Sequence, residues 1–158
     1  MEFKQTHMLA DEVCEAALEQ IRWGGDLCCL RCNSNRIRRL TSLGKSGKPR
    51  KLFWCHDCHY QFSVTVGTPF EDSHIPLSKW FWAIHRISST GNPVSARQIE
   101  RKLSIAYESA WTMRRRTIVA WENDRKFCEK IARFYVDQIE MDGLSRNATP
   151  GRLTSSDN

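Results

Sequence analysis

The sequence predicts a small α+β protein in which a metal-bound sheet precedes a group of helices. Two pairs of cysteines, Cys29-Leu-Arg-Cys32 and Cys55-His-Asp-Cys58, lie on either side of a hairpin-like segment. Three stretches with apolar residues at helical spacing follow between Pro76 and Asn123. A chain of 158 residues can hold one ordinary domain or two small ones, and this layout favours two units with separate cores.

The two cysteine pairs predict a structural zinc site. A C-x-x-C pair forms a tight turn that directs two thiolates to one point, and two such turns supply the four ligands of a tetrahedral zinc ion. The predicted ligands are therefore Cys29, Cys32, Cys55 and Cys58. Because a closed shell of four sulfurs leaves no position for water or substrate, this ion would stabilise the fold without taking part in chemistry.

Other ligand sets fit the same segment. Cys28 could replace Cys29, and His56 or His59 could replace a thiolate, although two identical C-x-x-C turns give the more symmetric site. The run from Cys55 to His59 also matches C-x-x-C-H, the attachment motif of c-type haem. Haem attachment normally follows export, which the polar N-terminus does not indicate, and haem would leave the first cysteine pair without a role.

Local patterns also predict the elements of the first unit. A helix is expected over residues 11–23, where apolar residues recur at helical spacing before two glycines. Residues 37–40 and 51–54 are expected to pair as a hairpin around a turn-rich loop, which accounts for the long gap between the cysteine pairs. Alternation of apolar and polar residues over 60–66 predicts a third strand.

Between Asp26 and Asp57 the sequence contains many bases and no acid. The whole chain has a net charge of +6 and a pI near 9.1, whereas residues 1–26 are acidic. Such a run can be only a solvated surface, but a cluster of one sign on a rigid hairpin favours binding to the phosphates of nucleic acid. The candidate contacts in this segment are Arg36, Arg38, Arg39, Lys48, Arg50 and Lys51.

Three helices are expected after the third strand. Pro76 opens a helix that ends before Gly91, and Ser95-Ala-Arg-Gln98 is a capping box that starts a short second helix. A brief break at Ser104-Ile105 precedes a longer helix over residues 106–123. Two helices joined by so tight a turn, after a first helix, predict a helix-turn-helix unit, with a plain three-helix bundle as the alternative.

In a helix-turn-helix unit the last helix enters the major groove, and nearby cations contact the DNA backbone. The residues placed to read bases are Tyr107, Glu108, Ser109 and Thr112. The residues placed to contact phosphates are Arg97, Arg101, Lys102, Arg115 and Arg116.

The remaining cysteines and the hydropathy indicate a reducing, aqueous compartment. Cys14 and Cys128 fall in helical patterns and are expected to be small buried apolar side chains, so a disulfide framework is not favoured. No apolar run approaches the length that spans a bilayer. We therefore expect a cytoplasmic, nucleoid-associated protein without a membrane partner.

In its order of elements and in several motifs, the chain resembles one family. The motifs are Ile21-Arg-Trp23, the Cys29/Cys32 turn, Cys55-His-Asp-Cys58-His-Tyr-Gln-Phe-Ser-Val-Thr-Val-Gly-Thr68, Pro76-Leu-Ser-Lys-Trp80, Val94-Ser-Ala96 and Ser109-Ala-Trp-Thr-Met-Arg114. These residues resemble the bacterial insertion-sequence transposases that carry an N-terminal zinc ribbon before a DDE, RNase H-like catalytic domain. The resemblance covers about residues 11–142, and the Phe-Ser-Val-Thr-x-Gly-Thr run is its most specific part.

The resemblance implies a strand with the first acid of a DDE triad after the helices. Ile139-Glu-Met-Asp142 fits that context and makes Asp142 the candidate, with Asp137 as the competing position. Two Mg²⁺ ions held by three carboxylates would perform phosphoryl transfer in such a site. The second Asp and the Glu do not follow Asp142 in this sequence, so Mg²⁺ is expected only if a complete catalytic domain is supplied elsewhere.

These inferences divide the chain into five parts. They are an N-terminal helix (1–26), a zinc ribbon (27–70), a helix-turn-helix region (71–126), the first strand of an incomplete RNase H-like domain (127–144) and a disordered tail (145–158).

The expected function is that of the DNA-binding N-terminal part of an insertion-sequence transposase, catalytically incomplete in this chain. Its partner would be double-stranded DNA at terminal inverted repeats, together with a second copy or a complete transposase. Two alternatives are a stand-alone zinc-ribbon regulator that inhibits transposition and a zinc-ribbon module that binds protein or RNA.

Overall fold

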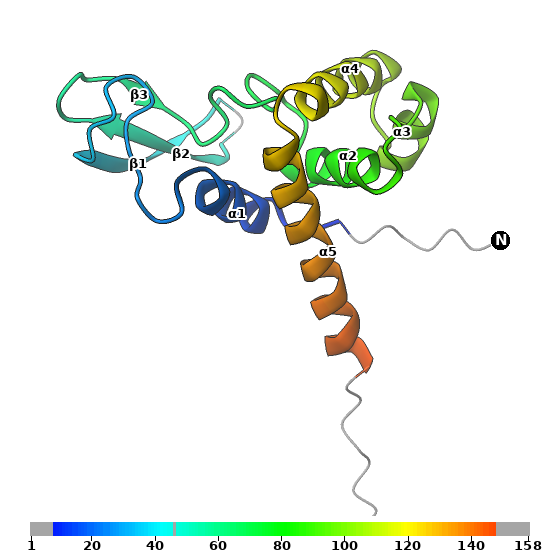
Figure 1. Ribbon diagram of the computed structural model, residues 1–158. Coiled ribbons are helices and arrows are strands. Elements are labelled where there is room, and N and C mark those ends of the chain that lie inside the picture. The colour runs from blue at the N-terminus through cyan, green and yellow to red at the C-terminus, as the bar shows by residue number, and fades with distance from the viewer. Residues whose placement is uncertain (1–7, 46, 148–158) are drawn as a thin grey trace, which may run out of the picture.

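Within residues 8–45 and 47–147, which the computed structural model describes, the chain forms five helices and one three-stranded sheet (Figure 1). The helices are α1 (Asp11–Trp23), α2 (Leu77–Thr90), α3 (Ala96–Leu103), α4 (Tyr107–Asn123) and α5 (Arg125–Asn147), and the strands are β1 (Ile37–Leu43), β2 (Pro49–Cys55) and β3 (Gln61–Phe62). The sheet and α1 form one end of the molecule, and α2 to α4 form the other. Helix α5 contacts α1, α2 and α4 and then runs away from both ends.

The sheet is antiparallel, with the strand order β1-β2-β3. The predicted hairpin is confirmed, and its register pairs Ile37 with Cys55 and Leu43 with Pro49. The predicted third strand is wrong beyond Phe62, because the chain turns at once. The Thr68 hydroxyl donates to the Thr65 carbonyl over 2.6 Å, and hydroxyl-to-backbone bonds of this kind compete with strand pairing.

Helix α1 packs on one face of the sheet. Its Trp23 ring packs on Phe53 of β2 and Phe62 of β3, with centroid distances of 5.7 and 6.3 Å. The helix ends at Gly24, whose φ of 59° is the left-handed conformation that glycine adopts at low cost. The predicted bounds of this helix are confirmed.

The predicted capping box at the start of α3 is also present. The Ser95 hydroxyl accepts from the Gln98 backbone N–H, and the Gln98 side chain accepts from the Ser95 N–H, each over 3.2 Å. The three residues 104–106 join α3 to α4. Ala96, Ile99 and Leu103 of α3 are buried, and their spacing places them on one face of the helix.

The spacing of residues 106–123 predicts an inward row of Ala106, Ala110, Met113, Thr117 and Trp121, and helix α4 buries most of it. Ala110, Met113 and Thr117 are buried, whereas Ala106 precedes the helix and is exposed. Ala120 is buried in addition. The prediction is therefore confirmed at three positions, and Ala120 is buried in place of Trp121, which is half-buried.

The region after Asn123 differs from expectation. Residues 127–144 were expected to begin an RNase H-like sheet, but they lie within helix α5. Apolar side chains at the helical offsets Cys128, Ile131 and Tyr135 are buried against the other helices, and this packing favours a helix over a strand. The predicted disordered tail is wrong at residues 145–147, which complete α5, and its remainder lies outside the described residues.

One hydrophobic core runs through both ends of the molecule, so the prediction of separate cores is wrong. The same cluster of buried residues contains Phe53 and Phe62 of the sheet and Trp80 of α2. Phe70 lies in the connector, defined here as residues 63–76, and is 2% exposed. Its ring lies 5.4 Å from Trp80 and 6.3 Å from Phe127 between centroids, and these contacts fix the connector against the helices.

Candidate metal centre and nucleic-acid interface

The two cysteine turns have the same backbone geometry at the same offsets. In each turn the first cysteine donates its N–H to the carbonyl five residues later and accepts from the N–H four residues later. These bonds are Cys29 N–H to Ser34 O (2.8 Å), Asn33 N–H to Cys29 O (3.0 Å), Cys55 N–H to Tyr60 O (3.0 Å) and His59 N–H to Cys55 O (3.0 Å). Asn33 and His59 both adopt a left-handed φ, of 59° and 58°, which closes each turn in the same way. The symmetry expected from two C-x-x-C pairs is present.

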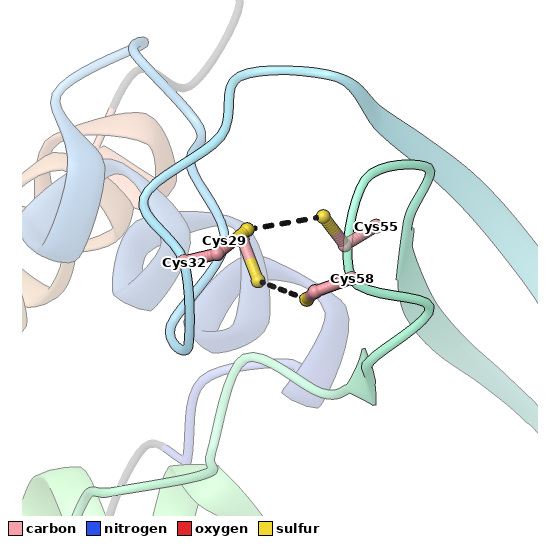
Figure 2. Close-up of side chains that lie close together, drawn as sticks. All are labelled: Cys29, Cys32, Cys55 and Cys58. Atoms are coloured by element: carbon pink, nitrogen blue, oxygen red, sulfur yellow. Dashed lines mark hydrogen bonds between the residues drawn. The ribbon is translucent and has the colours of Figure 1, made fainter.

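The two turns bring four sulfurs together (Figure 2). All four Sγ atoms lie within 4.8 Å of one another, and the Cys29–Cys58 and Cys32–Cys55 pairs are each 3.5 Å apart. A tetrahedral zinc ion with Zn–S bonds of about 2.3 Å separates its sulfurs by about 3.8 Å. The donor set and its spacing therefore fit a structural zinc ion, with no ligand position left for water.

The four thiols of the cluster differ in acidity. Against a backbone hydrogen bond from Ser34, burial and the neighbouring thiols raise the pKa of Cys32 to about 12. Backbone N–H groups, first that of Cys58, point at the Cys55 thiolate and lower its pKa to about 7, which favours the form that binds metal. Burial, with a smaller effect of Asp11, raises the pKa of Cys14 to about 12. Burial likewise raises the pKa of Cys128 to about 11, so the predicted apolar role of both cysteines agrees with the structure.

The alternative ligands stand apart from the sulfur cluster. The Cys28 thiol lies 4.0 Å from the side-chain oxygen of Asn33. The His59 ring stacks on Trp54, with 5.8 Å between centroids and an interplanar angle of 18°. Among the described residues, the four cysteines are the one group of three or more potential metal ligands, so neither histidine joins the site.

An acid ties the two turns together beside the sulfurs. Asp57 accepts hydrogen bonds from the Ser34 hydroxyl and from Arg36, the latter over 2.5 Å. The Ser34 bond and the Arg36 charge lower the pKa of Asp57. Arg36, a predicted DNA contact, is therefore already paired with a carboxylate.

Helix α1 supplies acids to two more of the predicted contacts. Arg39 of β1 forms an ion pair with Glu19, and Lys51 of β2 lies 3.4 Å from Glu15. Sequence reasoning missed these pairs because the acids lie outside the acid-free run. The other three predicted contacts, Arg38, Lys48 and Arg50, are exposed and form no ion pair within the part of the chain that is described.

The predicted contacts on α3 gather at the turn into α4. The Arg97 guanidinium lies 4.6 Å from the centroid of the Tyr107 ring and 3.4 Å from a carboxylate oxygen of Glu100. Tyr107 is 42% exposed, and both Arg101 and Lys102 are exposed on the last turn of α3. Aromatic and cationic side chains therefore share this surface.

The predicted contacts further along α4 differ in exposure. Thr112 is exposed, whereas Ser109 is half-buried. Arg115 is exposed and lies over the Trp111 ring at 5.8 Å from its centroid. Arg115 thus keeps its guanidinium available to a partner.

Arg116 has a structural role that the sequence did not reveal. Its guanidinium is partly buried and donates to the carbonyls of Glu71 (2.8 Å) and Pro69 (3.3 Å) in the connector. Sequence reasoning placed Arg116 with Arg115 because both follow the same basic run. Arg115 forms neither of these connector bonds.

Arg116→Ala should lower the free energy of unfolding by about 1 to 2 kcal/mol, since hydrogen bonds from a charged donor to two carbonyls are lost. Urea denaturation followed by tryptophan fluorescence measures this change. The adjacent Arg115→Ala is the matched control and should shift the free energy by less than about 0.5 kcal/mol. Equal losses in the two variants would contradict the role given to Arg116.

A groove of about 1020 Å³ lies between the connector and the helices α4 and α5. Its walls include Trp111, Thr112, Arg115 and Val119 of α4 and Lys130 of α5. Trp111 and Val119 are 50% and 47% exposed. The groove could not be inferred from the sequence, because its walls come from segments far apart in the chain.

Both candidate catalytic acids lie on α5. Asp137 is exposed and Asp142 is half-exposed. No group of three or more carboxylates or histidines assembles around either of them within the described residues. Within the described residues, therefore, neither acid belongs to a carboxylate cluster that could hold two metal ions.

The sheet, the four thiols and the attached helices define an α+β protein with an N-terminal zinc ribbon. Residues 9–61 match the family described as "Transposase zinc-ribbon domain", of the IS1595 type. The chain is also 29% identical over 122 residues to "Uncharacterized protein in transposable element ISH50" from Halobacterium salinarum (strain ATCC 700922 / JCM 11081 / NRC-1). That alignment covers 75% of this chain and 40% of the relative, so the chain spans less than half of the relative's length.

No solved structure matches the chain. The two sequence similarities support an insertion-sequence transposase, and the metal-binding zinc ribbon agrees with the sulfur geometry. None of the helices in the described residues is long and apolar enough to cross a bilayer.

Proposed function

We propose that this chain is the DNA-binding part of an insertion-sequence transposase and that it binds duplex DNA at the ends of its element. One observation carries the proposal: the segment that matches a transposase zinc ribbon, residues 9–61, is the segment whose four thiols converge on one metal site. The exposed cations on the ribbon and on the helices add the charge that phosphate binding requires.

Helices α2, α3 and α4 act in this proposal as a helix-turn-helix unit. The three-residue turn before α4 and the buried face of α3 support that assignment. Helix α4 would enter the major groove with Tyr107 and Thr112 toward the bases, while Arg97, Arg101 and Lys102 contact phosphates. Arg115 would add a phosphate contact from the wall of the groove.

In this proposal, strand transfer is performed by a complete transposase and not by this chain alone. Asp142, or Asp137 in the competing alignment, would be the counterpart of the first acid of a DDE triad. A two-metal site needs further carboxylates, which another segment or subunit would have to supply with Mg²⁺. Incubating the zinc-loaded chain with Mg²⁺ and element-end DNA should therefore yield no cleavage. Nicked product from this chain alone would contradict the proposal that it binds DNA without cutting it.

The experiment that tests the proposal is footprinting of the zinc-loaded chain on duplexes carrying the terminal inverted repeats that flank its gene. Protection of those repeats, and not of shuffled duplexes of the same composition, is the expected result. Binding to a protein or to RNA with no protection of DNA would favour the interaction-module alternative.

Arg115→Ala should weaken binding to any duplex about fivefold at low salt and reduce the slope of log affinity against log salt by about 1, since one phosphate contact is lost. Fluorescence anisotropy over a salt titration measures both quantities. Thr112→Ala is the comparison variant, because its loss should depend on the base sequence. An Arg115 effect limited to one base position would instead assign this side chain to base reading.

A further inference from the structure

The β1–β2 hairpin sorts its cations onto two faces. Successive side chains on a strand point to opposite sides. Arg39, Lys51 and Phe53 share the inner face, where Arg39 and Lys51 pair with acids of α1 and Phe53 contacts Trp23. The neighbouring residues Arg38 and Arg50 therefore point to the outer face, away from α1.

The outer face, defined as Arg38, Leu40, Ser42, Arg50, Leu52 and Trp54, contains no acid. Leu40 and Leu52 are register partners and only half-buried. Within the described residues, neither leucine belongs to the core or packs against it, so no helix covers the leucine pair, and the His59 ring stacks on Trp54 at one end of the face. Two exposed arginines thus flank an apolar pair on an open, two-stranded ribbon.

The spacing of the two arginines suits a nucleic-acid duplex. Arg38 pairs with Trp54, and Arg50 pairs with Ser42, so the two arginines lie four residues apart along the hairpin. At a rise of about 3.4 Å per residue, this offset is about 14 Å. The major groove of B-DNA is about 12 Å wide and accepts a two-stranded β-ribbon.

We propose that the outer face of the β1–β2 hairpin docks on duplex DNA, with Arg38 and Arg50 on phosphates of the two strands that border one groove. Leu40 and Leu52 face the groove between them, where they exclude water. The proposal rests on the proposed function and deepens it, because it selects one of two basic faces of the ribbon. Charge identifies the occupant: a face with cations and no acid complements a polyanion, and the acids of α1 neutralise the opposite face.

Two double variants with the same change of charge test this assignment. Arg38→Ala with Arg50→Ala removes two cations from the outer face, and Arg39→Ala with Lys51→Ala removes two from the inner face. The probe is a fluorescein-labelled 30-base-pair duplex titrated with the zinc-loaded full chain over a range of salt. Zinc content and thermal melting of each variant show that it is folded. Arg38→Lys with Arg50→Lys keeps the charge and should retain most of the affinity.

The outer variant should bind about tenfold more weakly at low salt, with its log–log salt slope reduced by about 1.8, as expected for two lost phosphate contacts. The inner variant should change less than threefold. Equal losses in the two variants, or a folded outer variant with wild-type affinity, would overturn the choice of face while leaving DNA binding intact. A wild-type chain that ignores the duplex at low salt would reject the proposed function and this inference together.

Discussion

Cys55→Ser should release the zinc ion, unfold the ribbon and also loosen the helices. Zinc binding supplies folding free energy outright in small metal-stabilised units, so the loss of one ligand of four removes the main constraint on both cysteine turns. The damage should extend further, because Phe53 and Phe62 of the sheet belong to the same core as Trp80 of α2. A metal-site variant should therefore lower the melting temperature of the entire described fold in one transition.

Zinc content by mass spectrometry and melting by far-ultraviolet circular dichroism measure these effects. Cys28→Ser is the matched control, because it removes a thiol from the neighbouring position that stands outside the sulfur cluster. This control should keep one zinc ion per chain and melt like the wild type. Helices that melt unchanged in Cys55→Ser would contradict the continuous core, and full zinc content in that variant would contradict the ligand set.

Phe70→Ala should destabilise the fold by about 3 to 5 kcal/mol, the range for removal of a fully buried aromatic ring. The ring is 2% exposed and contacts Trp80, Phe81 and Phe127, so a cavity would open where the connector meets α2 and α5. Because the connector leads directly from the ribbon, the sheet should lose its support on the helices as well.

Chemical denaturation gives the free energy for Phe70→Ala, and amide hydrogen exchange locates the loss. Exchange should accelerate in β2 and in α2 together. Leu43→Ala, at a side chain 76% exposed on the hairpin, is the control and should alter stability by less than about 0.5 kcal/mol. Faster exchange limited to α2 would show that the two ends of the molecule unfold independently.

The features predicted correctly from the sequence depend on local chemistry. The C-x-x-C turns, the glycine after α1 and the capping box at Ser95 each act within a few residues, so spacing alone identifies them. The hairpin itself also follows from two strand-like segments around a turn-rich loop, whereas its register came only from the structure.

The features that were missed depend on contacts between distant segments. The acids Glu15 and Glu19 reach the ribbon only because α1 packs on the inner face, and nothing in the basic run indicates their presence. Arg116 likewise resembles its neighbour Arg115 until the connector carbonyls lie beside it. The strand expected around Asp142 came from a family resemblance, whereas the apolar spacing up to Tyr135 is helical.

The fixed connector has a consequence for how DNA would be selected. The Phe70 ring packs on Trp80, and Arg116 donates to the connector carbonyls, so we expect the ribbon and α4 to keep a fixed position relative to each other on a double helix. Under the proposed function, the DNA segments contacted by the ribbon and by α4 would have to lie at a constant angle to each other around the helix axis. Inserting half a helical turn, about 5 base pairs, between their target segments would turn one segment to the far side of the duplex. Binding affinity would therefore depend on the length of the intervening DNA as well as on the base sequence of the two segments.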